Sequence, residues 1–108
     1  MNEIWKDIVG YEGLYQVSNL GNVKRINFFK KERFVIPCSK GSGYLYVSLS
    51  KNNKQKNFYI HRLVATAFIE NPDNLPVINH KDENRSNNIV DNLEWCTQKY
   101  NCNYGLHN

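Results

Sequence analysis

The sequence contains few cysteines and no long apolar run, and both absences restrict what the protein can be. Its three cysteines, Cys38, Cys96 and Cys102, cannot form a complete disulfide framework, and none belongs to a C-x-x-C pair that would suggest zinc. No stretch approaches the roughly 20 consecutive apolar residues of a membrane-spanning helix. Residues 1–7 lack the basic-then-apolar order of a signal peptide. We therefore expect a cytoplasmic protein with reduced thiols and no membrane partner.

The length and composition describe a small folded unit whose front half is basic. The 108 residues are 41% hydrophobic, 13% aromatic and 22% charged, which is typical of one compact domain or of two very small lobes that share a core. The net charge of +4 is unevenly distributed: residues 1–60 carry ten Lys or Arg against four Asp or Glu, and residues 61–108 carry four against six. The front half suits phosphate groups, although a basic surface kept for solubility would look the same.

Two β-hairpins are expected in the front half, where short alternating segments are separated by turn residues. The first joins residues 15–18 to residues 23–26 through the turn sequence Asn19-Leu20-Gly21-Asn22. The second joins residues 44–50 to residues 57–60 through a polar turn at residues 51–56 that contains three lysines. Between the hairpins, residues 30–33 read as a basic linker.

The periodicity changes at His61. Leu63, Val64, Ala67 and Phe68 fall at helical spacing and predict a buried helix that ends before Asn71-Pro72. A strand at residues 76–80, a polar loop at 81–91, a strand at 93–97 and a short helix at 98–104, ended by Gly105, follow in that order. The sequence thus predicts an α+β fold with a β-hairpin-rich front and a ββα unit at the back.

Several motifs, taken together and in order, carry a family resemblance. The run HRLVATAFI at residues 61–69 is followed by NHKD at 79–82, NN at 87–88, DNLEW at 91–95 and Asn101. These motifs resemble the HNH nuclease domain of phage and intron homing endonucleases. Residues 3–8 and 11–25 resemble the modular nuclease-associated motif often found ahead of that domain. The resemblance implies a basic, β-rich DNA-binding region at residues 1–58 and a ββα-metal (His-Me finger) nuclease core at residues 59–108.

The resemblance also implies individual roles and a metal-dependent DNA endonuclease in a bacterial or phage-infected host cell. His80 would be the general base, and Asn92 would be the middle asparagine, which ties the loop to the histidine strand through hydrogen bonds to the backbone. Asn79 would occupy the first metal-ligand position and Asn101 the place of a second histidine. Many family members have an aspartate where this chain has Asn79, so we expect a lower affinity for metal here.

The residue types agree with these roles. Hydrolysis of a phosphodiester needs a water that loses a proton near neutral pH, and histidine, with an ordinary pKa of about 6.5, suits that step. The negative charge that develops needs a Lewis acid. The amide oxygens of Asn79 and Asn101 are hard ligands, which favour Mg²⁺ or Mn²⁺ over zinc, with one ion per site.

Five further residues are expected to be structural. Asp82 should shape its loop by accepting hydrogen bonds from nearby backbone, and His61 should make a structural hydrogen bond at the helix N-terminus, although it could approach the site. Trp95, Cys96 and Cys102 should pack against other side chains.

Double-stranded DNA is the expected partner. The ribbon at residues 44–60 is narrow enough for a major groove, and one ββα-metal site should nick a single strand. A double-strand break would require a dimer or two events, and either a homodimer or a protein partner could supply sequence specificity. The cations expected to contact phosphates are Lys24, Arg25, Lys30, Lys31, Arg33, Lys51, Lys54 and Lys56.

Two other functions fit parts of the sequence. A non-catalytic DNA-binding module with a degenerate HNH site would explain the missing aspartate at Asn79. A small RNA-binding protein would explain the charge and the aromatic content.

Overall fold

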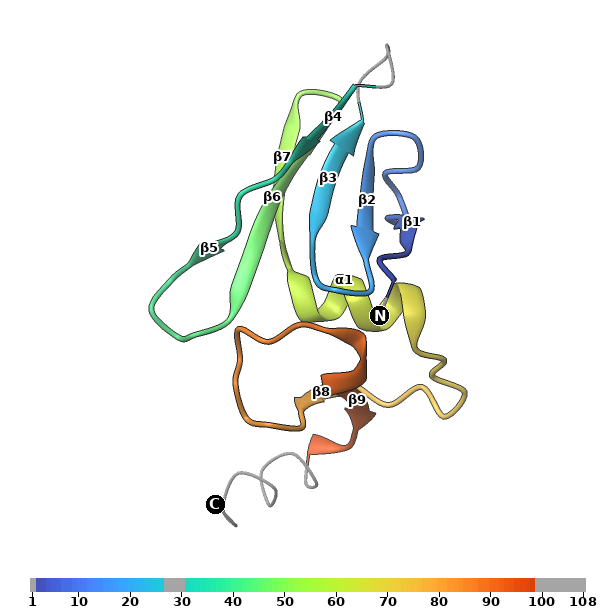
Figure 1. Ribbon diagram of the computed structural model, residues 1–108, viewed down its shortest axis with the longest axis vertical. Coiled ribbons are helices and arrows are strands. Elements are labelled where there is room, and N and C mark those ends of the chain that lie inside the picture. Colours follow the sequence, from blue (N-terminus) through green and yellow to red (C-terminus); the bar gives the residue numbers. More distant parts are fainter. Residues whose placement is uncertain (1, 27–30, 99–108) are drawn as a thin grey trace.

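The computed structural model describes residues 2–26 and 31–98, and in these segments three antiparallel sheets surround a single α-helix (Figure 1). This confirms the expected α+β class with a β-rich front half. The strands form a four-stranded sheet of order β1-β2-β3-β4, a three-stranded sheet β5-β6-β7 and a two-stranded sheet β8-β9. The bounds are β1 Trp5–Asp7, β2 Tyr15–Ser18, β3 Val23–Ile26, β4 Glu32–Phe34, β5 Cys38–Ser39, β6 Leu45–Lys51, β7 Lys54–Tyr59, α1 Ile60–Phe68, β8 Val77–His80, the 3₁₀ turn η1 Val90–Asn92 and β9 Leu93–Cys96.

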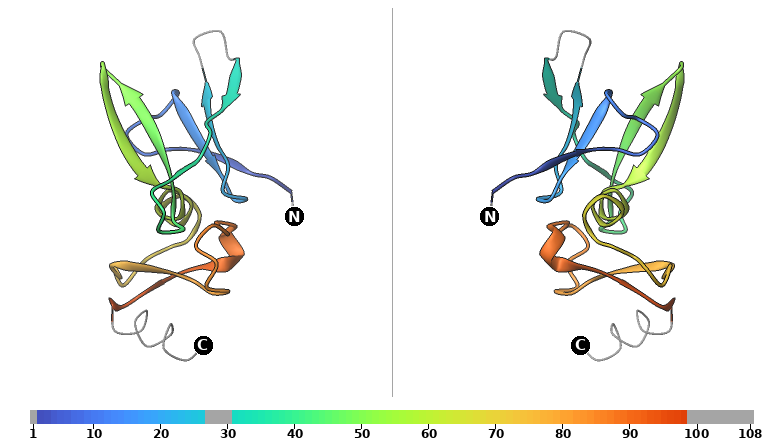
Figure 2. Two further views of the ribbon diagram at one scale, coloured as in Figure 1. Left: turned by 90° about the vertical axis from the view of Figure 1, so that its left-hand side faces the viewer. Right: turned by 90° about the vertical axis from the view of Figure 1, so that its right-hand side faces the viewer.

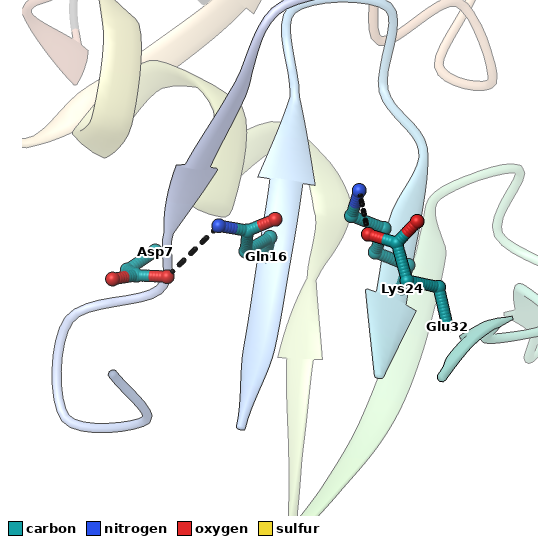
Figure 3. Close-up of polar contacts among 4 residues, drawn as sticks. All are labelled: Asp7, Gln16, Lys24 and Glu32. Atoms are coloured by element: carbon teal, nitrogen blue, oxygen red, sulfur yellow. Dashed lines mark hydrogen bonds and ion pairs between the residues drawn. The ribbon is translucent and has the colours of Figure 1, made fainter. Parts of the chain in front are cut away.

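The first expected hairpin is present as β2 and β3. Val17 pairs with Val23 across the ladder, and both side chains are buried. Because apolar and polar residues alternate in β2, Tyr15 and Val17 point into the core and the intervening Gln16 lies nearer the surface. Gln16 pairs with Asp7 of the neighbouring strand β1. The Gln16 amide donates a hydrogen bond of 3.1 Å to Asp7 of β1 (Figure 3).

The prediction of a basic linker at residues 30–33 is wrong for residues 32 and 33, because residues 32–34 form the edge strand β4. Residue 30 lies outside the described residues. The backbone of β4 pairs with β3, and Arg25 lies opposite Arg33. Phe34 places its ring 6.0 Å from Trp5, and Glu32 forms an ion pair with Lys24 (Figure 3). β3 is the preceding strand, but Trp5 of β1 is distant in sequence, so the composition of residues 30–33 alone did not indicate a strand.

The second expected hairpin is present as β6 and β7, but its turn is much shorter than predicted. Only Asn52 and Asn53 form the turn, with φ angles of 54° and 62°. Asparagine tolerates this left-handed backbone, and two consecutive residues of this kind make the turn that matches the twist of a hairpin. The ladder therefore continues to the pair Lys51 and Lys54. The three lysines expected in a turn, Lys51, Lys54 and Lys56, lie on strands instead.

Helix α1 is the expected buried helix, and it begins one residue earlier than predicted, at Ile60. It contacts β2, β6 and β7 on one side and β8, β9 and η1 on the other. Figure 2 shows the two larger sheets splaying apart above α1, with β8 and β9 below it. Val17, Val47, Leu49, Ile60 and Val64 are each almost fully buried between these elements. The core thus passes through α1 and joins all three sheets.

The two expected strands of the back half are present as β8 and β9, one residue shorter at one end each. Trp95 is half-buried against the core and donates from its indole nitrogen to the Ile69 carbonyl at 3.1 Å, and Cys96 is buried. Both residues pack as expected, and burial together with Glu94 raises the pKa of the Cys96 thiol. The expected helix at residues 98–104 and Cys102 lie outside the described residues.

The boundary expected at residue 58 falls inside β7, whose last residue, Tyr59, is also the N-cap of α1. The division into residues 1–58 and 59–108 stays a prediction. Among the described residues, no helix has the length and the apolar character needed to cross a bilayer.

Candidate active site

His80 ends strand β8, and only 5% of the residue is exposed. Its Nε2 lies 2.9 Å from Oδ1 of Asn88, which is itself 4% exposed. An amide oxygen can only accept a hydrogen bond, so Nε2 of His80 carries the proton and donates it. The lone pair of the neutral ring is therefore on Nδ1. A buried histidine whose tautomer is fixed in this way presents one defined basic atom.

Asn79 precedes His80 in β8 and has a different partner. It pairs across the ladder with Glu94 of β9, and its Nδ2 donates a hydrogen bond of 2.9 Å to Oε1 of Glu94. This bond fixes which end of the amide is nitrogen, and the Asn79 oxygen faces away from Glu94. An oriented amide oxygen with a carboxylate beside it suits a hard divalent cation.

The loop between β8 and β9 is organised around Asp82 and Asn92. The Oδ1 of Asn92 accepts the Asp82 backbone N–H at 3.0 Å, and its Nδ2 donates to Oδ1 of Asp82 and to the Asn87 carbonyl at 2.9 Å each. Asp82 also accepts from Nδ2 of Asn87 and from the backbone of Asn84, both at 2.8 Å. These hydrogen bonds, led by the one from Asn87, lower the pKa of the Asp82 carboxyl. Asp82 therefore has the loop-shaping contacts expected of it.

Further contacts attach this loop to the front half of the chain. Arg85 donates from its guanidinium to the Ser42 carbonyl at 2.8 Å and lies over the Tyr44 ring at 4.7 Å. The Ser86 hydroxyl donates to the Gly43 carbonyl at 3.0 Å. The segment between β5 and β6 thus holds the loop at its outer end.

His61 lies beside His80, and the expectation of a structural hydrogen bond at the helix N-terminus is wrong. Helix α1 has no side-chain cap, and the buried Nδ1 of His61 has no hydrogen-bond partner among the described residues. The two imidazole centroids are 5.2 Å apart in an edge-to-face arrangement, and the rings of Tyr44 and Tyr59 complete an aromatic cluster around them. Burial, followed by the nearby His80 and Arg62, lowers the pKa of His61 to about 4. His61 is therefore neutral near pH 7.

The expected DNA-binding cations fall into different environments. Arg25 and Arg33 lie opposite each other on β3 and β4, and with Lys31 and Glu32 they line a surface hollow of about 410 Å³. Like charges placed directly opposite on a ladder destabilise it unless an anion is present. Lys54 and Lys56 are exposed on β7, and Lys51 is exposed but donates to the Gly10 carbonyl at 2.7 Å.

Lys24, another of the expected DNA-binding cations, lies within the first sheet. Its ammonium pairs with Glu32 (Figure 3). It also lies 4.2 Å from the centroid of the Trp5 ring, and the side chain is only 12% exposed. Its charge is largely engaged within the sheet. Lys30 lies outside the described residues, as does Asn101, the second expected metal ligand.

Asn88 and Glu94 lie within the family motifs, but the sequence does not indicate a role for either. The position of Glu94 could have been predicted from the sequence. If the two strands pair in antiparallel fashion and both bury their apolar residues, the register places Glu94 opposite Asn79. Asn88 has no comparable signal, since its position depends on the path of the loop. The described residues contain no cluster of three or more His, Cys, Asp or Glu side chains that could hold a metal ion.

Comparison with known proteins adds to this geometry. Residues 3–50 match the NUMOD4 motif, and residues 58–102 match the HNH endonuclease family. The DNA endonuclease I-HmuI of Bacillus phage SP01 is 48% identical over 97 residues, which are 90% of this chain and 54% of that protein. An uncharacterized HNH endonuclease of Acanthamoeba polyphaga mimivirus is 43% identical over 104 residues, which are 96% of this chain and 30% of that protein.

A solved structure gives the same result. The structure that describes DNA binding and cleavage by the HNH homing endonuclease I-HmuI matches with a TM-score of 0.85 and 43% identity, over 96% of this chain and 58% of that one. The present chain therefore spans about half the length of I-HmuI. Both halves of the chain match, and they match in the order that the motifs predict. The chain thus carries a NUMOD4 motif followed by a segment of the HNH endonuclease family, and nearly all of it is similar to the HNH homing endonuclease I-HmuI.

Proposed function

We propose that this chain hydrolyses phosphodiester bonds of double-stranded DNA, with Nδ1 of His80 as the general base. The observation that carries the proposal is the hydrogen bond between Nε2 of His80 and Asn88, within the segment that matches the HNH endonuclease family. That bond leaves the Nδ1 lone pair to take a proton from water. The water oxygen then attacks phosphorus and the bond from phosphorus to the 3′ oxygen breaks. The leaving oxygen takes a proton from solvent, which gives 5′-phosphate and 3′-hydroxyl ends.

The proposed enzyme depends on one divalent cation, Mg²⁺ or Mn²⁺. When bound, the ion would stabilise the negative charge at the phosphate and the leaving oxygen. Asn79 and Asn101 would hold it through their amide oxygens. The hydrogen bond from Asn79 to Glu94 supports this assignment, because it orients the amide and adds the negative charge that an aspartate supplies in other members of the family.

Two groups of cations would hold the duplex. Arg25, Lys31 and Arg33 form one group at the hollow on β3 and β4, and Lys51, Lys54 and Lys56 form the other along the β6–β7 ribbon. Contacts of this type position DNA without reading its sequence. The side chains of Asn52 and Asn53, at the tip of the ribbon, would contact base edges.

A single site of this kind cuts one strand in each binding event, so we propose that the chain nicks DNA. A homodimer or a protein partner would be required for a concerted double-strand break or for long target recognition. Such an enzyme would act in the cytoplasm of a bacterial or phage-infected cell, where its substrate lies.

Incubation of the protein with supercoiled plasmid in Mg²⁺, Mn²⁺ or Zn²⁺ tests the proposal. We expect nicked circles with Mg²⁺ or Mn²⁺, and no nicking by His80→Ala when thermal denaturation shows that this variant is folded. Cleavage by His80→Ala at the wild-type rate would refute the general base.

A non-catalytic DNA-binding module is the second candidate, and Asn79 is the residue that favours it. That function predicts salt-sensitive DNA binding without cleavage at millimolar metal, together with activity gained by Asn79→Asp. Continued inactivity of Asn79→Asp would show that Asn79 is not what prevents cleavage.

A further inference from the structure

The turn between β2 and β3 is held rigidly. Ser18 is fully buried, and its hydroxyl accepts the backbone N–H groups of Leu20 and Asn22 at 3.2 and 3.1 Å. Asn19, 5% exposed, accepts the N–H of Ile4 at 2.8 Å and donates to the Asn2 carbonyl at 3.0 Å. The turn therefore has a fixed position relative to the N-terminal segment.

This rigid turn contacts the loop that carries Asn88. The Asn19 carbonyl accepts the Val90 backbone N–H at 2.8 Å. Gly21 lies so close to the loop that a Cβ at its position would be 3.0 Å from both the Cβ and the carbonyl oxygen of Asn88. Its φ of +85° also favours glycine. No side chain fits at this position unless the loop moves.

The contact continues to the general base, because Asn88 accepts the hydrogen bond from His80. We propose that the β2–β3 turn of the NUMOD4 segment is a positioning part of the active site: Gly21 and Asn19 fix Asn88, and Asn88 fixes the His80 ring. The catalytic consequence rests on the proposed function, whereas the packing relationship does not. The NUMOD4 segment thereby acts on the chemistry as well as on DNA binding.

Gly10 provides a matched control within the same segment. Its φ is +87°, almost the same as that of Gly21, but a Cβ at its position would meet nothing within 4 Å. Alanine at either position therefore carries a similar backbone strain. Only the substitution at Gly21 also pushes against Asn88.

The first experiment measures plasmid nicking and stability for Gly21→Ala and Gly10→Ala. Both variants should lower the melting temperature, but only Gly21→Ala should lower kcat, by about tenfold or more, with KM unchanged. In an Asn88→Ala background, Gly21→Ala should still lower the melting temperature but should not lower kcat further. Equal kcat losses in the two glycine variants, or additive kcat losses with Asn88→Ala, would overturn the inference.

The second experiment does not depend on activity. In the proton NMR spectrum, the Nε2–H of His80 should give a slowly exchanging signal that His80→Ala removes. Gly21→Ala should shift or broaden this signal, and Gly10→Ala should not. An unshifted signal in Gly21→Ala contradicts the inference. If the wild type fails to cut plasmid, the proposed function fails and the NMR result still decides the packing relationship. Should Gly21→Ala not fold, Gly21→Asn keeps the added Cβ with less backbone strain, and Gly10→Asn is its control.

Discussion

Asn79 and Glu94 lie opposite each other on β8 and β9, joined by a hydrogen bond of 2.9 Å from amide nitrogen to carboxylate. The pair places a negative charge one side chain away from the proposed metal ligand. Many members of the family have an aspartate at the position of Asn79. In this chain the negative charge is on the neighbouring Glu94 and not on the proposed ligand. The metal affinity of the chain should therefore depend on Glu94.

Glu94→Gln should weaken Mn²⁺ binding by about tenfold, because glutamine can still accept the Asn79 hydrogen bond but carries no charge. Mn²⁺ titration followed by electron paramagnetic resonance measures the affinity directly. Glu83→Gln removes the same charge from the exposed loop and serves as the control. Equal affinities for wild type and Glu94→Gln would show that Glu94 does not act on the ion.

Asn92→Ala should lower the free energy of unfolding by about 1–2 kcal/mol, because it removes one acceptor and two donor contacts within the loop. Chemical denaturation measures this loss, and plasmid nicking should fall with it. Asn92→Asp keeps the acceptor but places a second carboxylate against Asp82, so it should be at least as destabilising as alanine at pH 7. A fully stable Asn92→Asp would contradict the hydrogen-bond assignment.

Acid should destabilise the protein through His61. The folded-state pKa of His61 is about 4, below the ordinary value, so the unfolded chain takes up a proton first as the pH falls. The stability contribution is complete above about pH 6.5 and is lost as the pH falls from there toward 4, by roughly 3 kcal/mol at most. Unfolding free energies at several pH values in this window measure the slope.

His61→Phe is the matching variant for that measurement, because it keeps an aromatic ring in the cluster but cannot be protonated. Its stability should change less between pH 6.5 and 4.5 than that of the wild type. Parallel curves for the two proteins would assign the acid sensitivity to other groups.

Arg25→Gln and Arg33→Gln should each weaken DNA binding and reduce the dependence of log K on log salt concentration by about 1, as expected for the loss of one phosphate contact. Lys24→Gln removes the same charge from the same sheet, but its ammonium is engaged with Trp5 and Glu32. That variant should lower stability and leave the salt dependence unchanged. A reduced slope for Lys24→Gln would show that its ion pair opens to DNA.

The features that local sequence determines could be predicted. The β2–β3 hairpin and α1 follow from alternation, from the spacing of Leu63 and Val64 and from the turn residues between β2 and β3. The motifs around His80 are sufficient to indicate the resemblance to HNH nucleases. Asp82 was also expected to shape its loop, because a short acidic side chain readily binds nearby backbone.

The features that depend on distant partners could not be predicted. Strand β4 pairs with the preceding strand β3, but its Phe34 also packs near Trp5, which is distant in sequence. Nδ1 of His61, which lacks a hydrogen-bond partner among the described residues, is buried because of the way α1 meets β8. Asn88 reaches His80 only through the fold of a loop whose composition would suit many conformations.

The passage from β7 into α1 without a connecting residue has a mechanical consequence. Because Tyr59 ends the strand and is also the N-cap residue of α1, the ribbon tip at Asn52 and Asn53 cannot move independently of the helix that packs against β8. A duplex bound to the ribbon would therefore contact a rigid protein surface, and the DNA itself would have to bend to bring the scissile bond to His80. Cutting rates should then follow the flexibility of the base-pair steps between those two points of contact.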